Sequence, residues 1–268
     1  MKGNLVCVGT GMMLGAHISP ICQSHIEHAD VVFSLMASGI SERWLEEKNN
    51  DVRSLQHYYQ EGKNRNRSYN EMVAAIMDEV KAGKKVVAAF YGHPGIFACV
   101  AHRAIKIAHV EGFDAYMEPG ISAESCLYAD LAIDPGNYGC AHYEASQFLY
   151  NKRQIDTSAY LVLWQIGLVG DKTLTKFSTE KAYKQLLVDL LIKSYPEDHQ
   201  VILYQAKVLP IDTIRADKIA LKELANHEIF QHTTLVIPPS KKMLVNQDIL
   251  DKLEQLELKN KRPKLTLV

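Results

Sequence analysis

The segment Phe90-Tyr91-Gly92-His93-Pro94-Gly95-Ile96-Phe97 is the strongest indication of an α/β fold in this chain. An apolar run at 86–89 precedes it and a helix-periodic run at 98–105 follows it, which predicts strand, tight turn and helix. Gly92 and Gly95 lack a Cβ atom, so another backbone or a ligand can approach closely there. Ligands of open α/β sheets bind where strands end and helices begin. A plain connecting turn is an equally good interpretation of these eight residues taken alone.

The composition is that of an ordinary globular protein with a sizeable core. The 268 residues are 47% hydrophobic and 23% charged, and the formal net charge is −1. This balance gives no global attraction to nucleic acid or to an anionic membrane. No apolar run reaches the roughly 18 residues that a membrane span needs. The first strand begins at once, without a signal-peptide layout, so we expect a cytoplasmic location.

The five cysteines indicate neither a disulfide framework nor a structural zinc site. Their number is odd, they are widely spaced, and no two of them form a C-x-x-C pair. His25 and His28 lie three residues apart on a predicted helix, but no third metal ligand accompanies them. The sequence therefore predicts no metal site.

A glycine-rich loop follows the first predicted strand, which covers residues 5–8. Its glycines are spaced G-x-G-x-x-x-G from Gly9 to Gly15, whereas dinucleotide-binding folds use G-x-G-x-x-G. A Rossmann-type NAD site is therefore not predicted. Ser19 and Pro20 then predict the start of a helix, because serine is a good N-cap and proline suits the first helical position.

Residues 56–71 are unusually rich in tyrosine and in basic side chains. Ser68 and Glu71 match the capping-box pattern, which predicts that a helix begins there with Tyr69 at its first position. Arg65 is then expected one loop turn earlier. A cation close to a tyrosine favours the phenolate and lowers the tyrosine pKa. The composition of the segment also fits a solvated surface or an RNA-binding region.

The second half of the chain has longer predicted strands than the first. These strands cover 140–144, 160–166, 201–206 and 234–237, with helices near 180–194 and 221–226. We expect an N-terminal α/β domain over 1–120, a C-terminal α/β domain over 121–240, and a basic, partly helical tail over 241–268. Ser122 predicts the start of a helix just after the boundary.

Four of these segments resemble the tetrapyrrole-methylase superfamily of S-adenosylmethionine (SAM) methyltransferases. They are Val8-Gly9-Thr10-Gly11, Gly92-His93-Pro94-Gly95, Pro119-Gly120-Ile121-Ser122-Ala123 and Thr233-Thr234-Leu235-Val236-Ile237-Pro238-Pro239. The resemblance runs from about Gly3 to Lys242. It implies a two-domain α/β fold with SAM in the cleft between the domains and S-adenosylhomocysteine as a product.

Further segments resemble one branch of that superfamily, the borosin (omphalotin-type) peptide backbone α-N-methyltransferases. They are Tyr58-Tyr59 with Gly62-Lys63, Arg65 and Tyr69; Tyr91-Gly92-His93-Pro94; Ala129-Asp130-Leu131 with Ile133-Asp134-Pro135; and Tyr143-Glu144-Ala145-Ser146. The first loop lacks the G-P-G-D pattern of corrin- and haem-pathway members, which argues against a porphyrinoid substrate. The resemblance implies iterative methylation of amide nitrogens in a ribosomally made precursor peptide.

The partners follow from the same resemblance. The chain ends at Val268 without an apolar core segment after the tail, so it resembles the split bacterial kind, which acts on a separate precursor. The resemblance implies a homodimer, and a heterotetramer when the precursor is bound. No nucleic-acid or membrane partner is expected.

The resemblance also assigns roles to residues. Arg65, Tyr69, Tyr91 and Tyr59 are implied to be catalytic: Arg65 stabilises a tyrosinate or the developing imidate oxygen, and Tyr69 is a base or proton relay. Tyr91 faces both amide and methyl donor, and Tyr59 holds the substrate carbonyl. The implied cofactor-binding residues are Tyr91, His93, Ile96, Phe97, Ser122, Ala123, Gln165, Ala206, Thr233 and Thr234. A place in the core is an equally good interpretation of Ile96, Phe97 and Ala206.

Three other functions fit parts of the sequence. The first is methylation of a tetrapyrrole or another small molecule. The second is RNA binding or RNA modification through the tyrosine- and arginine-rich segment, against which the net charge of −1 speaks. The third is an inactive scaffold that only clamps a partner. The sequence predicts neither the precursor nor the number, order and residue preference of the methylations.

Overall fold

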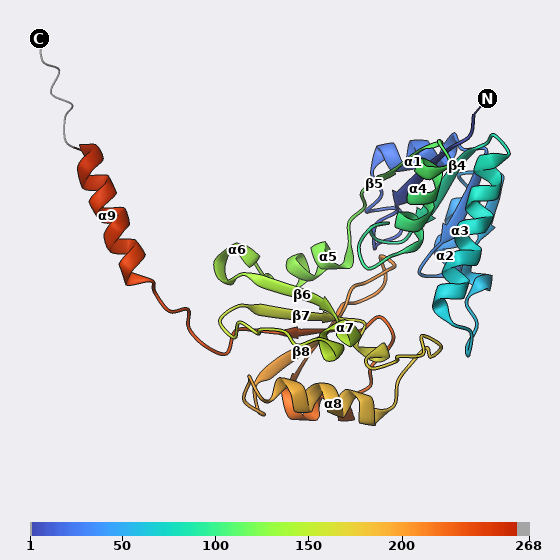
Figure 1. Cartoon of the computed structure of the whole chain (residues 1–268). Coiled ribbons are helices and arrows are strands. Elements are labelled where there is room, and N and C mark those ends of the chain that lie inside the picture. Colours follow the sequence, from blue (N-terminus) through green and yellow to red (C-terminus); the bar gives the residue numbers. More distant parts are fainter. Residues whose placement is uncertain (1, 262–268) are drawn as a thin grey trace, which may run out of the picture.

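The structure, a computed structural model, describes residues 2–261 and contains two five-stranded sheets (Figure 1). The elements within residues 4–118 surround the first sheet and are called the N-terminal lobe; those within 123–237 surround the second and are called the C-terminal lobe. The α/β fold with two sheets expected from the sequence is confirmed. That the two lobes are separate domains divided near residue 120 stays a prediction.

The N-terminal lobe is a parallel sheet of strand order β3-β2-β4-β1-β5 with helices on both faces. Its elements are β1 (Asn4–Gly9), α1 (Pro20–Glu27), β2 (Val31–Leu35), α2 (Gly39–Glu46), β3 (Val52–Ser54), the 3-10 turn η1 (Gln56–Tyr58), α3 (Arg65–Lys81), β4 (Lys85–Phe90), α4 (Val100–Val110) and β5 (Asp114–Glu118). Leu5 and Cys7 of β1 pack with α3 and α4, whereas Val6 and Val8 pack with α1 and α2. Because both faces are covered, the central strands are almost entirely buried.

The C-terminal lobe is a mixed sheet of strand order β6-β7-β10-β8-β9. Its elements are α5 (Ala123–Asp130), α6 (Pro135–Tyr138), β6 (Cys140–Glu144), α7 (Ala145–Tyr150), β7 (Tyr160–Trp164), the 3-10 turn η2 (Ile166–Leu168), α8 (Lys181–Leu191), β8 (Gln200–Gln205), β9 (Arg215–Ala220), the 3-10 turn η3 (Leu221–Asn226) and β10 (Thr234–Ile237). Leu161 and Leu163 of β7 face α7, α8 and η3, whereas Val162 and Trp164 face α5. This alternation is the period of two expected of a strand between two layers.

The start of α3 differs from the prediction. The helix begins at Arg65 instead of Ser68, because Asn64 is its N-cap and accepts the amide N–H of Asn66 at 2.9 Å. Asparagine caps helices at least as well as serine. Tyr69 is therefore not at the first helical position: it lies one turn after Arg65 on the same helix, where residues i and i+4 are neighbours.

The residues of the expected capping box make other contacts. The Ser68 hydroxyl donates to the carbonyl oxygen of Tyr58 at 2.8 Å, which holds η1 against α3. The Glu71 carboxylate pairs with Lys63 and, at 3.0 Å, with Arg67. A nearby lysine and arginine thus draw Glu71 away from a role in capping.

Other boundaries follow the sequence more closely. Ser19 and Ser122 cap α1 and α5 as predicted, each accepting a hydrogen bond from the amide three residues on. The helix expected near 221–226 is a 3-10 turn, and β9 and α7 were not predicted. In β9 the side chains from Ala216 to Lys218 are exposed, so the strand shows no apolar pattern and is defined by its pairing with β8.

Three glycines lie where β1, β4 and β5 end. A Cβ atom on Gly9 would lie 2.6 Å from both the amide nitrogen of Gly120 and the carbonyl oxygen of Gly92, which real structures do not tolerate. Gly92 also has φ +66°, a conformation that favours glycine. The close approach expected at Gly92 is therefore an approach of the chain's own strand ends, and it brings the loops after β1, β4 and β5 together.

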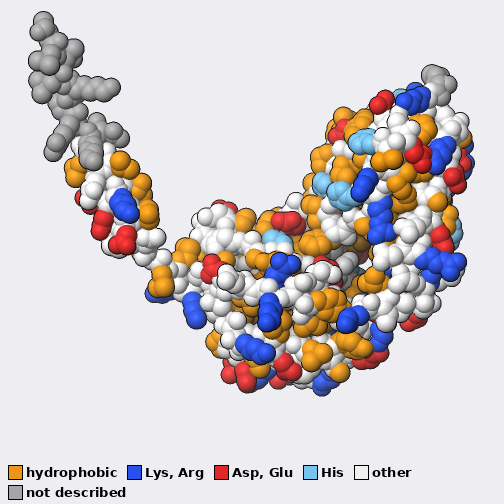
Figure 2. Space-filling view, in the orientation of Figure 1, with side chains coloured by type: hydrophobic (Ala, Val, Ile, Leu, Met, Phe, Trp, Pro, Cys, Tyr) orange, Lys and Arg blue, Asp and Glu red, His pale blue; other side chains and the backbone are white. Residues whose placement is uncertain are grey.

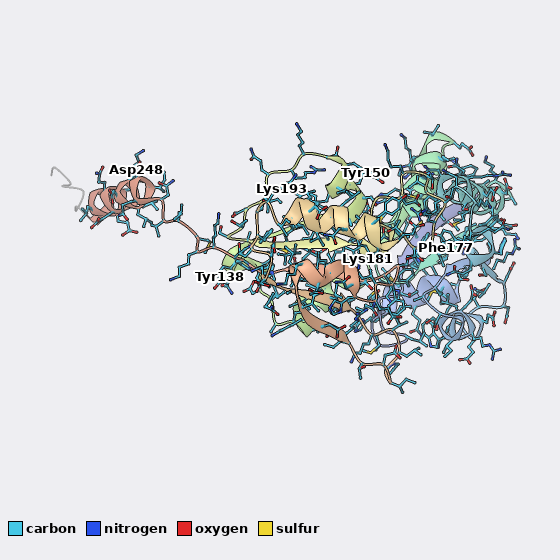
Figure 3. All side chains as sticks on the ribbon, turned by 90° about the horizontal axis from the view of Figure 1, so that it is seen from below. Tyr138, Tyr150, Phe177, Lys181, Lys193 and Asp248 are labelled. Atoms are coloured by element: carbon cyan, nitrogen blue, oxygen red, sulfur yellow. The ribbon has the colours of Figure 1, made fainter. Side chains whose placement is uncertain are left out.

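The last described element is α9 (Gln247–Lys261), which extends away from both lobes (Figure 1). Figure 3 shows the same from a second direction, with Asp248 apart from Tyr138 and Lys193. The helix predicted within the tail is confirmed; the part of the tail beyond residue 261 lies outside the described residues. Leu250, Leu253 and other apolar side chains of α9 are about half exposed. No helix among residues 2–261 is long and apolar enough to cross a membrane.

Candidate active site

The four residues expected to be catalytic lie together beside the first turns of α3. Tyr59 follows η1, and its ring meets that of Tyr69 edge to face with the centroids 6.1 Å apart. Tyr91 follows β4 and lies close enough to both phenols to affect their pKa values. Arg65 acts on the Tyr69 pKa from one turn earlier on the same helix. The structure thus assembles these side chains from three separate segments.

Burial raises the pKa of all three tyrosines. For Tyr59 the neighbouring phenols of Tyr69 and Tyr91 add to the effect of burial. For Tyr69 burial and Cys99 outweigh the positive charge of Arg65, so its pKa is raised on balance. Burial raises the pKa of Tyr91 as well, although 44% of the residue is exposed. The lowered phenol pKa expected from the sequence is therefore wrong, and these phenols are uncharged at neutral pH.

Arg103 of α4 completes this side of the site and was not predicted from the sequence. Its guanidinium lies over the ring of Tyr69, 5.6 Å from the centroid. It also donates to the side-chain oxygens of Asn66 at 2.7 Å and Asn70 at 2.9 Å, both on α3. Arg103 therefore braces the helix that carries Arg65 and Tyr69. The sequence did predict a helix after the Phe90–Phe97 segment, and the place of Arg103 on that helix was the signal that could have indicated it.

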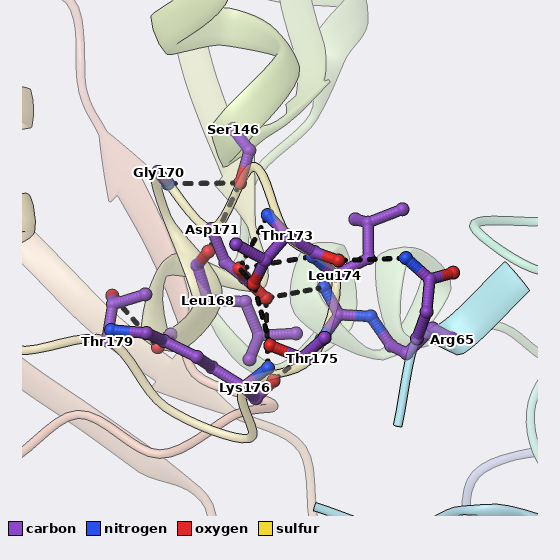
Figure 4. Close-up of polar contacts among 12 residues, drawn as sticks. Arg65, Ser146, Leu168, Gly170, Asp171, Thr173, Leu174, Thr175, Lys176 and Thr179 are labelled. Carbon is purple, nitrogen blue, oxygen red and sulfur yellow. Dashed lines mark hydrogen bonds and ion pairs between the residues drawn. The ribbon is translucent and has the colours of Figure 1, made fainter. Parts of the chain in front are cut away.

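Arg65 reaches from the N-terminal lobe to a loop of the C-terminal lobe (Figure 4). Its Nη1 donates to the carbonyl oxygen of Lys176 at 2.8 Å, and its Nη2 lies 3.4 Å from Oδ2 of Asp171. Asp171 is only 3% exposed. Burial by itself would raise the Asp171 pKa, but hydrogen bonds from Thr173 and from the Lys176 amide, with the charge of Arg65, hold that pKa below its usual value. Asp171 is 106 residues from Arg65, so no sequence pattern indicated it.

The loop after β4 presents apolar side chains to solvent. Ile96 is 37% exposed and Phe97 46% exposed, so these two residues do not belong to the core. The Phe97 ring packs at 5.4 Å on Trp164, which ends β7 in the other lobe. The ring of His93 accepts the Gly95 amide at 2.9 Å through Nδ1, and its pKa is lowered by burial. The loop is thus folded back on itself and rests on the C-terminal lobe.

Three further cofactor candidates of the sequence, Ser122, Ala123 and Gln165, lie in the segments that follow β5 and β7. Ser122 is the N-cap of α5 and Ala123 its first residue; a Cβ on Gly92 would lie 4.0 Å from the Ser122 Cα. Gln165 directly follows Trp164 and adopts a left-handed conformation with φ 59°. A helix N-terminus next to a strand end is suited to polar or negatively charged ligand groups.

Thr233, Thr234 and Ala206 lie behind Gln165 in the C-terminal lobe. Thr233 is fully buried, and its hydroxyl oxygen accepts the side-chain amide of Gln205 at 2.6 Å. Its carbonyl oxygen accepts the amide N–H of Ile166 at 3.2 Å, which ties it to the Gln165 segment. Thr234 is buried as the first residue of β10, and Ala206 packs against the core beneath α5. These three residues therefore hold the segment around Gln165 in place, and they form little of the surface of the site.

A second polar cluster, centred on His142 of β6, was missed by the sequence analysis. The indole N–H of Trp164 donates to His142 Nδ1 at 3.1 Å, and the planes of the two rings are inclined by only 18°. On its other side His142 Nε2 contacts the Tyr128 hydroxyl at 2.6 Å, Sγ of Cys140 at 3.1 Å and Glu124 at 3.5 Å. His142 thereby fixes the indole against which Phe97 packs. A lone histidine inside a strand gave no signal of this role.

Tyr91 also lines a small hollow at the surface. The loop after β1, the end of β2, helix α2 and Val208 of the C-terminal lobe line it, with Met36 and Trp44 among the apolar side chains. Figure 2 shows that the molecular surface is concave where the two lobes meet. Within residues 2–261 no three His, Cys, Asp or Glu side chains are placed to hold a metal ion.

Comparison with known proteins identifies related sequences. The family "Tetrapyrrole (Corrin/Porphyrin) Methylases" matches residues 4–210. A methyltransferase/ribosomally synthesized cyclic peptide gymnopeptides precursor from Gymnopus fusipes is 40% identical over 95% of this chain and 61% of its own length. The corresponding omphalotin A precursor from Omphalotus olearius is 40% identical over 95% of this chain and 62% of its own length. The chain thus spans about three fifths of the length of these relatives.

Solved structures share the fold at low identity. A cobalt precorrin-4 methyltransferase superimposes with a TM-score of 0.63 at 16% identity, covering 88% of this chain and 94% of its own. A uroporphyrin-III-C-methyltransferase from Thermus thermophilus gives a TM-score of 0.61 at 15% identity, covering 89% and 93%. At this level of identity the likeness concerns the two-lobed architecture alone.

Proposed function

Because the chain belongs to the tetrapyrrole (corrin/porphyrin) methylase family, we propose that it is a SAM-dependent methyltransferase of the backbone amides of a ribosomally made peptide, acting iteratively. The family and the relatives support a methyltransferase activity. The observation that carries the choice of a peptide is the 40% identity, along 95% of the chain, to methyltransferases whose names include a cyclic peptide precursor. The clustered tyrosines and Arg65 are consistent with this choice.

The residues around Phe97 fit SAM. The exposed apolar side chains of Ile96 and Phe97, with the N-terminus of α5 and the polar Gln165 in the neighbouring segments, suit a ligand with a flat purine and a polar amino-acid end. Phe97 and Ile96 would hold the adenine, and Ser122 and Gln165 the polar groups. When bound, SAM supplies an electrophilic methyl group, and S-adenosylhomocysteine is left.

The protein's own residues must make the amide nitrogen reactive. A peptide N–H is a very weak acid, because the nitrogen lone pair is delocalised into the carbonyl. Tyr69 is uncharged at neutral pH, so it must pass its own proton to solvent or to a neighbouring phenol before or as it takes the amide proton. Once deprotonated, a phenol with a raised pKa is a stronger base than an ordinary one, which narrows the pKa difference from the amide. We assign Tyr69 as the base or proton relay, Tyr59 and Tyr91 as the groups that orient the amide, and Arg65 as the charge that stabilises developing negative charge.

The partners are part of the same proposal. We propose that the enzyme is a cytoplasmic homodimer and that its peptide substrate is a borosin-type precursor. Both points rest on the resemblance to borosin enzymes and on the relatives whose names include a precursor peptide.

Intact-mass spectrometry tests the proposal. The protein is incubated with SAM and a precursor peptide encoded beside its gene, and fragmentation then locates any added methyl groups. We expect stepwise additions of one methyl each on backbone amides. Tyr69→Phe should abolish them while SAM binding, measured by calorimetry, persists; Tyr138→Phe, at an exposed tyrosine of α6, is the matched control. SAM binding without any peptide methylation would overturn the peptide assignment and favour a small-molecule substrate.

A further inference from the structure

The loop 171–176 has an unusual relation to the start of α3. Four consecutive carbonyl oxygens, those of residues 173 to 176, accept hydrogen bonds from the segment Gly62–Arg65. The donors are the side-chain amide of Asn64 at 2.9 Å, the amide N–H of Arg65 at 2.8 Å, that of Gly62 at 3.0 Å and the Arg65 guanidinium at 2.8 Å. The first turn of the helix that bears Arg65 is thus held by the opposite lobe.

The buried carboxylate of Asp171 shapes this loop. Its Oδ1 accepts from the amide N–H and hydroxyl of Thr173 at 3.0 and 2.5 Å and from the amide of Leu174 at 3.1 Å. Its Oδ2 accepts from the amide of Lys176 at 3.1 Å. Because these N–H groups turn inward to the carboxylate, the carbonyl groups of the same residues turn outward to α3. Leu174 adopts φ +57°, a strained conformation that the ring of hydrogen bonds supports.

Asp171 also faces Arg65 directly. The Arg65 side chain is 12% exposed and that of Asp171 1% exposed, with Nη2 and Oδ2 3.4 Å apart. A buried carboxylate with four N–H or O–H donors and one cation is fully engaged, so it has little freedom to move. Asp171 therefore fixes the guanidinium twice: once by charge, and once through the Lys176 carbonyl that it orients.

We propose that Asp171 is a positioning residue for the methyl-transfer site, setting the place of Arg65 and the first turn of α3 relative to Tyr69. This inference rests on the proposed function as far as catalysis is concerned. It also makes the loop 171–176 the link through which the C-terminal lobe controls the tyrosine cluster of the N-terminal lobe. Asp171 itself touches no reacting group.

Asp171→Asn keeps the contacts of one carboxylate oxygen, Oδ1, and disturbs those of the other, Oδ2. The asparagine oxygen can still accept from Thr173 and Leu174, whereas its NH₂ group faces the Lys176 amide and the Arg65 guanidinium as a donor against donors. Asp156→Asn is the matched control, because the Asp156 Oδ1 accepts from the amide and hydroxyl of Ser158 at 2.8 and 2.6 Å in the same local turn.

The first measurement is amide hydrogen exchange, which needs no activity. We expect the protection of the Gly62 and Arg65 amides to fall about tenfold in Asp171→Asn, with the middle of α3 and the Asp156→Asn control unchanged. Unchanged protection at both amides would overturn the proposal, whether or not the protein methylates peptides.

The second measurement is peptide methylation. We expect kcat of Asp171→Asn to fall about a hundredfold, as a small misplacement of a catalytic group can cost, with KM for SAM within about twofold. When Arg65→Lys is already present, adding Asp171→Asn should lower kcat by less than a further factor of about two, because both substitutions act on one contact. The positioning role would be contradicted if the two substitutions lowered kcat independently, so that their effects multiplied in the double variant. It would also be contradicted if Asp171→Asn raised KM for SAM and left kcat unchanged. Absence of methylation by the unaltered protein, with exchange as expected, would reject the proposed function and leave the structural link intact.

Discussion

The buried indole of Trp164 donates its N–H to His142. The indole N–H can only donate, so the His142 Nδ1 that receives it at 3.1 Å must be unprotonated. Neutral His142 therefore carries its proton on Nε2, the atom that contacts Tyr128 and Cys140. The substitution His142→Phe keeps a ring of similar size but removes the acceptor.

The magnitude follows from burial. Trp164 is 6% exposed, so its N–H loses its partner without gaining water. Leaving a buried donor unsatisfied costs about 1–3 kcal/mol. For a chain of this size that corresponds to a fall in Tm of about 2–12 °C at neutral pH. His142→Asn is the control, because its side-chain oxygen stands near the place of Nδ1 and can accept the indole proton.

The pH dependence of this difference has a definite sign. Burial lowers the pKa of His142 below 6.5, although the nearby Glu124 opposes the effect. The unfolded chain therefore binds a proton at a higher pH than the folded one, and His142 reduces the stability of the native protein as pH falls through 6.5. The His142→Phe protein has no ionisable group at this position, so it does not lose stability in this way as the pH falls. We expect the difference in unfolding free energy between the two proteins to narrow from about pH 7.5 to about pH 5.5.

Urea denaturation across this pH range measures the difference, and tryptophan emission of Trp164 in a Trp44→Phe background reports the indole directly. A His142→Phe protein as stable as the parent at pH near neutrality would refute the inferred hydrogen bond. A difference that does not change with pH would refute the lowered pKa of His142 in the folded protein.

Three further predictions concern stability and reactivity. Gly120→Ala places a Cβ atom onto the carbonyl oxygen of Gly92 and should cost about 1–3 kcal/mol or more in urea denaturation; an unchanged midpoint would contradict the packing of the strand ends. Tyr204→Phe removes a 2.7 Å bond from a buried hydroxyl to the Asp130 carboxylate and should cost about 1.5–3 kcal/mol by thermal unfolding. Burial raises the pKa of the Cys7 thiol to about 12, so Cys7 should resist a thiol reagent until the protein unfolds, as peptide mapping after labelling can check.

Matched substitutions serve as controls for Gly120→Ala and Tyr204→Phe. Gly39→Ala adds a Cβ that meets no atom within 4 Å, so it should leave the stability nearly unchanged. Tyr138→Phe removes the hydroxyl of a tyrosine that is 49% exposed and should have an effect below about 0.5 kcal/mol.

Local signals in the sequence predicted most of the fold, and their failures have identifiable causes. Ser19 with Pro20 located the start of α1 because capping depends only on neighbouring residues. The start of α3 was misplaced because Asn64 and Ser68 are both good caps, and the choice depends on Lys63, which draws Glu71 away. The strand β9 carries no apolar pattern of its own, and only its pairing with β8 defines it.

In the site, too, the features set by neighbouring residues were predicted, and those set by residues far apart in the sequence were not. The loop that presents Phe97 was recognisable from its glycines and its place between strand and helix. Its partner Trp164, and the His142 ring behind it, come from other strands. The sign of the tyrosine pKa shifts also escaped prediction, because a nearby Arg65 is visible in the sequence whereas the burial that outweighs it is not.

The electrostatics of the tyrosine cluster agree with the peptide substrate proposed above. A corrin or porphyrin precursor carries many carboxylates, and binding it requires cations that are free to pair with them. The two arginines that adjoin Tyr69 already have partners: Arg65 is held by Asp171 and the Lys176 carbonyl, and Arg103 by two asparagines of α3. Uncharged phenols beside engaged guanidinium groups suit an uncharged amide, whose desolvation costs far less than that of a carboxylate.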